Sequence, residues 1–329
     1  GDAAADPLFS YVDPKALAKP TYAAFIALLD NYIAELGQSE VVDAHELTEN
    51  RRFLNLIMDT PVMQYAHQYL LRTGKTRAST REQFIAELDA LWFALYRRRT
   101  NNDSSGFEPV FVGEVKEENN EIVGFHNWIQ LYLEEKKGRF DYRGFIKPKR
   151  QSLPGRVPRA CEQLISLQFM WRGAIKRVSS SFIGTSPEFE VALYTLCFYM
   201  NQQDLLVQTG PYRVQITCHR WPPNARPGQR EYIATAFPSD APWDEDEVRC
   251  RYIICLCLFA YIYDCVSYRL PRRSNPRCEL RLRSRILEVA KCPASSFLEV
   301  AVFLKAVLAM FWSNEPSHSL IIDIVGNYH

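Results

Sequence analysis

The sequence predicts an α+β protein, with helices in its first hundred residues and antiparallel strands after them. Two patterns carry this prediction. Apolar residues recur at helical spacing in the first part, and short runs rich in β-branched and aromatic residues, bounded by turn signals, follow it. With 329 residues, of which 47% are hydrophobic and 23% charged, the chain can bury a large core and is not disordered. Its formal charge of +1 excludes the strongly basic field of a nucleic-acid coat protein, but not a local basic surface.

Three amphipathic helices are predicted in the first hundred residues. Apolar side chains recur at helical spacing from Phe25 to Leu36 and again from Phe53 to Met58. A third helix opens with Ser79, three residues before Glu82, which is the spacing of a capping box. Its apolar stripe ends at Arg97-Arg98-Arg99. We interpret the three stripes as surfaces that face a core.

A polar breaker, Asn101 to Gly106, separates these helices from the first predicted strands. The composition predicts a strand over Phe107 to Val115 and a returning strand over Ile122 to Phe125, joined by a turn at Glu117 to Asn120. A helix is then expected from Asn127 to Lys137, with Gly138 as its C′ residue.

The later part of the sequence predicts one more helix and a strand pair. Ser186-Pro187-Glu188 combines an N-cap residue, a proline at the first helical position and an acid in the first turn. Tyr212 to Trp221 and Tyr232 to Phe237 are expected to pair, because a Pro- and Gly-rich loop, Pro222 to Arg230, joins them.

These patterns divide the chain into a helical lobe over residues 1–100, a sheet lobe over 101–238 and an atypical tail over 239–329. The tail holds an acidic run, an arginine-rich stretch and six of the nine cysteines. One hypothesis is that the tail is translated non-coding sequence. Its longest apolar runs, Tyr252 to Tyr263 and Phe297 to Trp312, fall short of the roughly 20 residues that span a bilayer, so we expect no membrane anchor.

The cysteines form no C-x-x-C pair and show no zinc-ligand spacing, so neither a zinc site nor a disulfide framework is predicted. Because Gly1 opens the sequence, we expect a processed form or a fragment of a longer product. Secreted and intracellular locations both stay open.

Several short phrases occur in this chain in the order in which they occur in one known family. They are Ser104-Ser105-Gly106-Phe107-Glu108, Val110-Phe111-Val112-Gly113-Glu114, Gly124-Phe125-His126-Asn127-Trp128, Leu133-Glu134-Glu135-Lys136-Lys137-Gly138, Phe182-Ile183-Gly184-Thr185-Ser186-Pro187-Glu188-Phe189-Glu190 and Ile233-Ala234-Thr235-Ala236. Over about residues 7–238 the chain therefore resembles the EndoU family of poly(U)-specific endoribonucleases.

The resemblance implies a helical N-terminal lobe followed by antiparallel sheets that carry an EndoU-type catalytic cleft. It also implies cleavage of single-stranded, uridine-rich RNA by attack of the ribose 2′-OH on the adjacent phosphate, giving a 2′,3′-cyclic phosphate. Such a reaction needs a base, an acid and a cation that stabilises the phosphorane. We expect RNA as the partner, no DNA and no membrane, a monomeric protein, and Mn²⁺ as a possible family-based cofactor.

Carried over residue by residue, the resemblance implies His126 and Lys176 as catalytic residues. Thr235, Phe237 and Ser186 are expected to bind the substrate. The other histidines have no such context and are interpreted as structural or exposed. Arg97-Arg98-Arg99 and Lys147-Pro148-Lys149-Arg150 are interpreted as solvated faces, with contact to the RNA backbone as the alternative.

Glu108 and Glu114 are the supporting acids that flank the family's first histidine. We leave three roles open for them: binding Mn²⁺, orienting the histidines, or capping a sheet edge.

The sequence departs from the family at two positions. Pro109 stands where the family has its first histidine, and Phe237 stands where it has a tyrosine. Proline carries no side-chain proton, and losing a general acid or base costs about 10²–10⁴ in rate. Two hypotheses follow: an active enzyme in which Glu108, or a histidine brought in by folding, replaces the missing group, or an RNA-binding pseudoenzyme.

Overall fold

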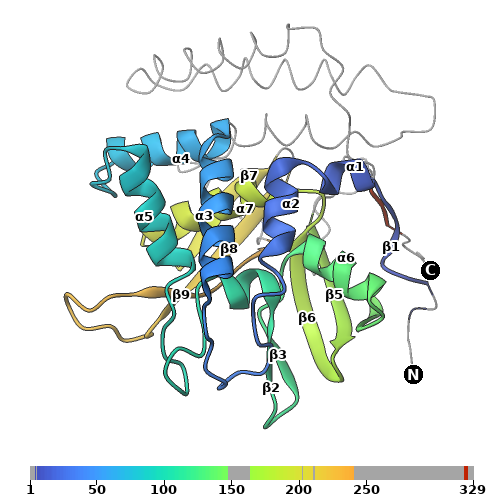
Figure 1. Cartoon of the computed structure of the whole chain (residues 1–329). Helices are drawn as coiled ribbons and strands as arrows, with labels where there is room; N and C mark the ends of the chain where they lie inside the picture. The colour runs from blue at the N-terminus through green and yellow to red at the C-terminus, as the bar shows by residue number, and fades with distance from the viewer. Residues whose placement is uncertain are drawn as a thin grey trace, which may run out of the picture.

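A computed structural model describes residue 4 and residues 6–146, 164–201, 203–209, 212–240 and 322–324. It confirms the α+β class: helices gather on one side of the molecule and strands on the other (Figure 1). Most of the tail predicted over residues 239–329, including its cysteine-rich stretch, and the basic segment 147–150 lie outside the described residues.

The helical part precedes residue 100 as predicted. In chain order it consists of β1 (Phe9–Val12), α1 (Pro14–Leu17), α2 (Pro20–Ala27), α3 (Ala44–Met58), α4 (Pro61–Arg72) and α5 (Arg81–Trp92). Strand β1 pairs antiparallel with the short β10 (Ile322–Ile324), which lies within the predicted tail.

Two helix boundaries differ from the prediction. The helix expected to reach Leu36 ends at Ala27, because the segment beyond it leaves the helix and binds a strand: the Leu36 amide donates to the Val115 carbonyl at 3.0 Å. The capping box of α5 uses Thr80 and Gln83 instead of Ser79 and Glu82. Both pairs have the required spacing, so the sequence alone could not separate them.

The remaining elements form two sheets and two further helices. They are η1 (Glu108–Val112), β2 (Glu114–Lys116), β3 (Glu121–Val123), α6 (Trp128–Lys136), β4 (Phe140–Phe145), β5 (Leu164–Trp171), β6 (Ala174–Phe182), α7 (Pro187–Tyr199), β7 (Asp204–Thr209), β8 (Tyr212–Trp221) and β9 (Tyr232–Asp240). One sheet has the order β2-β3-β6-β5-β4 and the other the order β7-β8-β9. Helix α6 begins after its N-cap Asn127, and Gly138 follows it with φ +68°, as predicted.

The strand predicted over Phe107 to Val115 is wrong for most of its length. Glu108–Val112 form one turn of π-helix, and only Glu114–Lys116 are extended. Pro109 has no amide hydrogen to give to a strand ladder, whereas the first turn of a helix leaves that position unbonded. All five residues of this turn are buried, so their apolar run reflects burial and not a strand period.

Helix α7 lies at the centre of the molecule between the helical part and the sheets (Figure 1). Every residue from Pro187 to Cys197 is buried, which is the pattern of a helix covered on all sides. Because β6 ends directly before α7 and β8 packs against it, the two sheets meet at one place. Strands β6 and β9 are in contact there.

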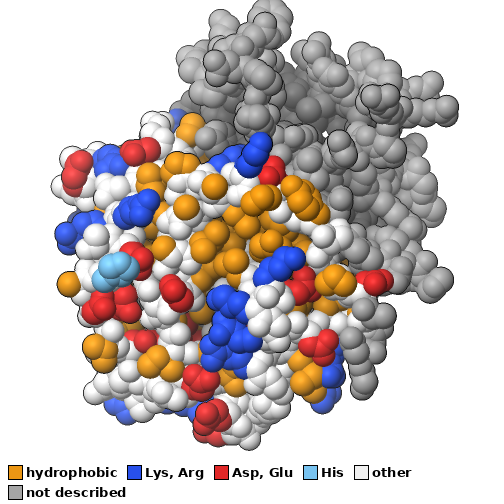
Figure 2. Space-filling view, turned by 45° about the vertical axis from the view of Figure 1, so that its right-hand side comes forward, with side chains coloured by type: hydrophobic (Ala, Val, Ile, Leu, Met, Phe, Trp, Pro, Cys, Tyr) orange, Lys and Arg blue, Asp and Glu red, His pale blue; other side chains and the backbone are white. Residues whose placement is uncertain are grey.

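The surface matches the balanced composition. On the face shown in Figure 2, acidic and basic side chains are interspersed, with a group of Lys and Arg side chains near the centre beside a hydrophobic area. Among the described residues, no helix is both long and apolar enough to cross a membrane.

Candidate active site

A strained turn carries His126 into the region where the sheets meet. Gly124 and Phe125 both have φ +67°, in the left-handed region. A Cβ on Gly124 would lie 1.6 Å from the carbonyl oxygen of Pro109, so only glycine fits there. The amide of Phe125 donates to that same carbonyl at 3.2 Å. Position 109, where the family places its first histidine, therefore lies directly beside the turn that holds His126.

Packing holds the strained Phe125 in place. Its ring lies 4.7 Å from the ring of Trp171 and 5.3 Å from that of Phe169, both in β5. A bulky residue in the left-handed region costs about 1–3 kcal/mol, which persists only where the surroundings fix it. This aromatic cluster thus fixes the backbone that precedes His126.

The environment of His126 determines which of its nitrogens carries the proton. Nδ1 lies 2.7 Å from the carbonyl oxygen of Ser180, which can only accept, so Nδ1 donates. Burial, together with the nearby charge of Lys176, lowers the pKa of His126 to about 3. At neutral pH the ring is therefore uncharged, and Nε2 holds the lone pair. This state can accept a proton but cannot donate one from Nε2.

Lys176, in β6, places an ionisable amine near His126. Its Nζ donates to the carbonyl oxygen of Ile122 at 3.0 Å. Burial lowers the pKa of Lys176 to about 8, although Glu121 opposes this shift. The ammonium form therefore predominates at neutral pH, close enough to His126 to act on its titration.

The third part of the site comes from strand β9. Phe237 stacks on the His126 ring, with ring centres 4.7 Å apart and planes 20° from parallel. Thr235 is two residues away, on the same face of the sheet. Its Oγ1 is buried and has no hydrogen-bond partner among the described residues. An unsatisfied hydroxyl beside an aromatic ring suits a planar ligand that carries polar edge atoms.

Strand β9 is tied to the rest of the site on both sides. The hydroxyl of Ser180 donates to the carbonyl oxygen of Pro238. On the other side, Arg98 donates to the carbonyl oxygen of Ala234 and the Tyr96 hydroxyl donates to that of Ile233 at 2.9 Å. Thr235 and Phe237 are thus held from β6 and from the segment that follows α5.

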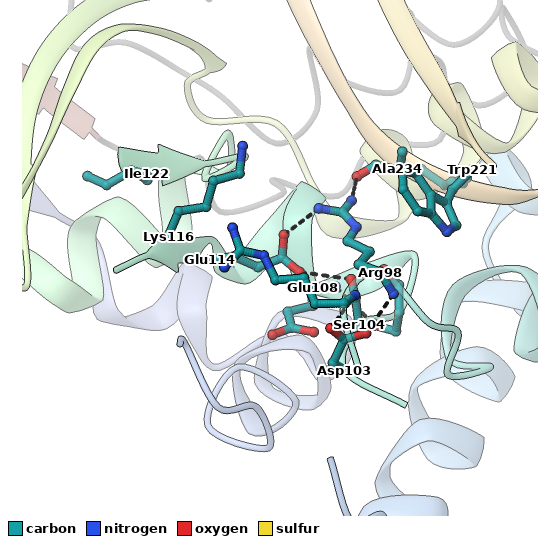
Figure 3. Close-up of polar contacts among 12 residues, drawn as sticks. Arg98, Asp103, Ser104, Glu108, Glu114, Lys116, Ile122, Trp221 and Ala234 are labelled. Atoms are coloured by element: carbon teal, nitrogen blue, oxygen red, sulfur yellow. Dashed lines mark hydrogen bonds and ion pairs between the residues drawn. The ribbon is translucent and has the colours of Figure 1, made fainter. Parts of the chain in front are cut away.

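Of the two supporting acids, Glu114 belongs to this second connection, and Glu108 lies near it (Figure 3). Glu114 is fully buried and accepts from Arg98 Nη1 at 2.7 Å and from the hydroxyl of Ser104 at 2.8 Å. Because Arg98 also holds Ala234, Glu114 positions β9 through Arg98. The prediction that the whole arginine run is a solvated face is therefore wrong for Arg98, whose side chain is 11% exposed.

Glu108 lies close to Glu114 and is almost completely buried, with one carboxylate oxygen unpaired among the described residues. Burial raises the pKa of Glu108 well above its ordinary value, and the charge of Glu114 raises it further. Burial also raises the pKa of Glu114, although Arg98 opposes the shift. Both carboxyl groups therefore have raised pKa values, and Arg98 is a cation that opposes the shift in each.

No three of the His, Cys, Asp and Glu side chains in the described part of the chain form a group that could hold a metal ion. Glu108 and Glu114 are buried, and Glu114 is already occupied by Arg98 and Ser104. The two acids therefore do not fit a Mn²⁺ centre by themselves.

Within the described part of the chain, no hydrogen bond joins Ser186 to the other candidate residues. It is the N-cap residue of α7, 4% exposed, and its carbonyl accepts from the amides of Phe189 and Glu190. The structure brings His126, Lys176, Thr235 and Phe237 together, and it places Ser186 in a buried helix start.

From the sequence, Arg98 was interpreted as part of a solvated face and His219 as structural or exposed, and Ser180 received no role. In the structure, Ser180 orients His126 and binds β9, and Arg98 connects Glu114 to β9. His219 on β8 pairs with Thr235 on β9, so their side chains lie on the same face of the sheet. Only Ser180 had a signal, since it lies four residues after Lys176 in a serine-rich run.

Comparisons with known proteins find relatives over most of this chain. The family described as Endoribonuclease XendoU matches residues 1–238. A poly(U)-specific endoribonuclease of Xenopus tropicalis is 43% identical over 243 residues, which cover 72% of this chain and 78% of that protein. Uridylate-specific endoribonuclease B of Danio rerio is 43% identical over 242 residues, covering 72% and 80%.

A solved structure gives the same result in three dimensions. The structure of XendoU, described as a splicing-independent snoRNA-processing endoribonuclease, aligns with a TM-score of 0.61 at 40% identity. The alignment covers 74% of this chain and 87% of the XendoU chain. The family match spans the helical part, both larger sheets and every candidate site residue. This protein therefore belongs to the XendoU family of endoribonucleases.

Proposed function

We propose that this protein is a uridylate-specific endoribonuclease that cleaves single-stranded RNA and leaves a 2′,3′-cyclic phosphate. One observation supports this most directly: the hydrogen bond from His126 Nδ1 to Ser180 fixes a neutral ring whose Nε2 can take a proton. In this reaction Nε2 removes the proton of the ribose 2′-OH, and the 2′-oxygen attacks the adjacent phosphorus.

Lys176 stabilises the charge that develops on the phosphorane. An ammonium group held by a backbone carbonyl in a half-buried position is a fixed cation, which interacts more strongly with a developing anion than a solvated one does. Because its pKa is about 8, activity that depends on this charge should decline above that pH.

Thr235 and Phe237 form the seat for the uracil. The ring of Phe237 offers a stacking surface, and the unpartnered Thr235 hydroxyl offers one hydrogen bond to the base edge. Poly(U)- and uridylate-specific relatives support uridine as the preferred base. The protein acts on RNA and not on DNA, because the attacking group is the 2′-OH. We propose that it does so as a monomer.

The substitution at Pro109 favours a second candidate function, an RNA-binding pseudoenzyme. The backbone at position 109 contacts the turn of His126, but a proline there supplies no proton carrier. Such a protein would keep the uridine seat and lose turnover.

The test is cleavage of a fluorescent RNA oligonucleotide that contains one uridine, with a 2′-deoxyuridine version as the control. The natural chain should cut only the ribose form, on the 3′ side of the uridine, and mass spectrometry should detect the cyclic phosphate. Binding without cleavage, together with cleavage by Pro109→His, would establish the pseudoenzyme instead. Runs with and without Mn²⁺ test the family-based cofactor prediction.

A further inference from the structure

The proposed reaction leaves one role unassigned in this chain. Once His126 has taken the 2′-OH proton, the bond from phosphorus to the 5′-oxygen breaks, and that oxygen needs a proton. His126 starts the reaction uncharged, and Pro109 carries no proton. A second carrier must come from elsewhere.

His219, in β8, is the histidine that folding brings to this place. Its Cα partner across the β8–β9 pair is Thr235, so the two side chains lie next to each other on one face of the sheet. Its ring centre lies 6.1 Å from that of Phe237, the ring that stacks on His126. Two imidazoles therefore flank the seat proposed for the uracil.

The His219 side chain is also available to a ligand. It is partly exposed, and the structure gives its ring no hydrogen bond or ion pair with any described residue. The β8–β9 register shifts directly after it, between His219 and Arg220. Bulges of this kind redirect side chains and occur often beside active sites.

The other described histidines are engaged elsewhere. His45 lies on α3, 78% exposed, 3.7 Å from Glu49. His67 stacks on Phe84 and binds the Ala78 carbonyl at 2.6 Å. Glu108, the remaining sequence-based candidate, is almost completely buried among Glu114 and Arg98.

We propose that His219 is the general acid of this chain, a catalytic imidazole that replaces the histidine lost at position 109. This inference rests on the proposed function. In its protonated form His219 gives a proton to the departing 5′-oxygen while the P–O5′ bond breaks and the 2′-oxygen–phosphorus bond is complete. The reaction ends with His126 protonated and His219 neutral, and exchange with water restores both.

The experiment uses four proteins: the natural chain, His219→Gln, Pro109→His and the double variant. Each is assayed on single-uridine RNA and on the same RNA with the bridging 5′-oxygen replaced by sulfur. A thiolate leaves without protonation, so a variant that lacks only the acid should still cut this substrate. Affinity for the uncleavable 2′-deoxyuridine oligonucleotide and thermal melting report binding and folding.

We expect His219→Gln to lower kcat on ordinary RNA by about 10²–10⁴, the usual loss for a general acid. Its rate on the 5′-thio substrate and its affinity for the deoxy oligonucleotide should stay within about threefold, which is well below the effect of a lost proton carrier. In the Pro109→His background the same substitution should cost less than about tenfold, because the imidazole at position 109 supplies the proton.

Three results would overturn the proposal. Equal losses on both substrates, or in both backgrounds, would make His219 a binding or structural residue. Unchanged cleavage by His219→Gln would mean that another group donates the proton, while the proposed function stands. If the natural chain cuts neither substrate and Pro109→His cuts both, the natural chain is a pseudoenzyme, and His219 does not replace the missing histidine as general acid.

Discussion

Two regions meet at the candidate site and use their charged groups in opposite ways. In the first region, Glu108 and Glu114 are buried, and Glu114 binds Ser104 and Arg98, which in turn binds the backbone of β9. Around His126, the polar atoms of Thr235 and His219 lack partners among the described residues, and the ring of Phe237 is half-buried. In the first region, the contacts of Glu114 are made within the protein and hold the position of β9, although one oxygen of Glu108 has no partner among the described residues. The second keeps unused hydrogen-bonding capacity for a substrate.

This difference shows why the motif around Glu108 and Glu114 can survive the loss of its histidine. Glu114 acts on β9 through Arg98, and this connection does not pass through the side chain at position 109. Substitutions in the two regions should therefore separate stability from turnover.

The largest effect is expected for His126→Ala. It removes the base, so cleavage should fall by about 10²–10⁴. The melting temperature should fall moderately, because the substitution also removes the hydrogen bond to Ser180 and the stacking contact with Phe237. Rates on single-uridine RNA and thermal melting measure the two quantities. A variant that unfolds while cleavage per folded molecule persists would assign His126 to the structural region instead.

The next effect is expected in the other region. Glu114→Ala leaves Arg98 buried beside Glu108 without its ion-pair partner, and unfolding free energy should fall by about 3–5 kcal/mol. The matched control is Glu118→Ala, which breaks the exposed pair with Arg99 and should cost no more than about 1 kcal/mol. Urea unfolding compares them. A small loss at Glu114 would mean that Glu108 takes over its contact with Arg98.

A pH series on Glu190→Gln tests a third buried acid, at the start of α7. Burial raises the pKa of Glu190 to about 8, while Thr185 and Asn127 bind one of its oxygens. An unfolded glutamate titrates near ~4.3. The folded form therefore binds one more proton between these values, and its stability falls as pH rises through that window.

Glu190→Gln removes this titration. The variant should match the natural chain near pH 4 and exceed its unfolding free energy by roughly 5 kcal/mol at pH 9, because each pKa unit between the unfolded and folded values contributes about 1.4 kcal/mol. The exposed Glu118→Gln should leave the slope unchanged. Parallel stability curves for all three proteins would show that Glu190 stays charged in the fold.

Short sequence motifs were enough to select four candidate residues that lie near one another in the fold. His126, Lys176, Thr235 and Phe237 each lie in or near a recognisable phrase, and the structure brings all four together. The role of Arg98 could not be predicted, because an arginine run is usually solvated and its ion-pair partner, Glu114, lies 16 residues later in the sequence.

The missed features depend on register between distant segments. His219 becomes a candidate only through its pairing with Thr235, and no local sequence pattern predicts that pairing. The π-helical turn at Glu108–Val112 was mistaken for a strand because a fully buried apolar run has no period that separates the two.

The smallest effect is expected at Phe237, which differs by one hydroxyl oxygen from the tyrosine that the family resemblance implies there. Phe237→Tyr restores the hydroxyl and keeps the ring on His126, so the gain is limited to one hydrogen bond. A net value of about 0.5–1.5 kcal/mol gives roughly a two- to tenfold rise in kcat/KM for uridine-containing RNA. Phe237→Ala is the counterpart, since it removes stacking worth about 1–3 kcal/mol per base. If the tyrosine variant gained a hundredfold or more, the hydroxyl would be a partner in the chemistry, and the ring alone would not explain why the position is aromatic.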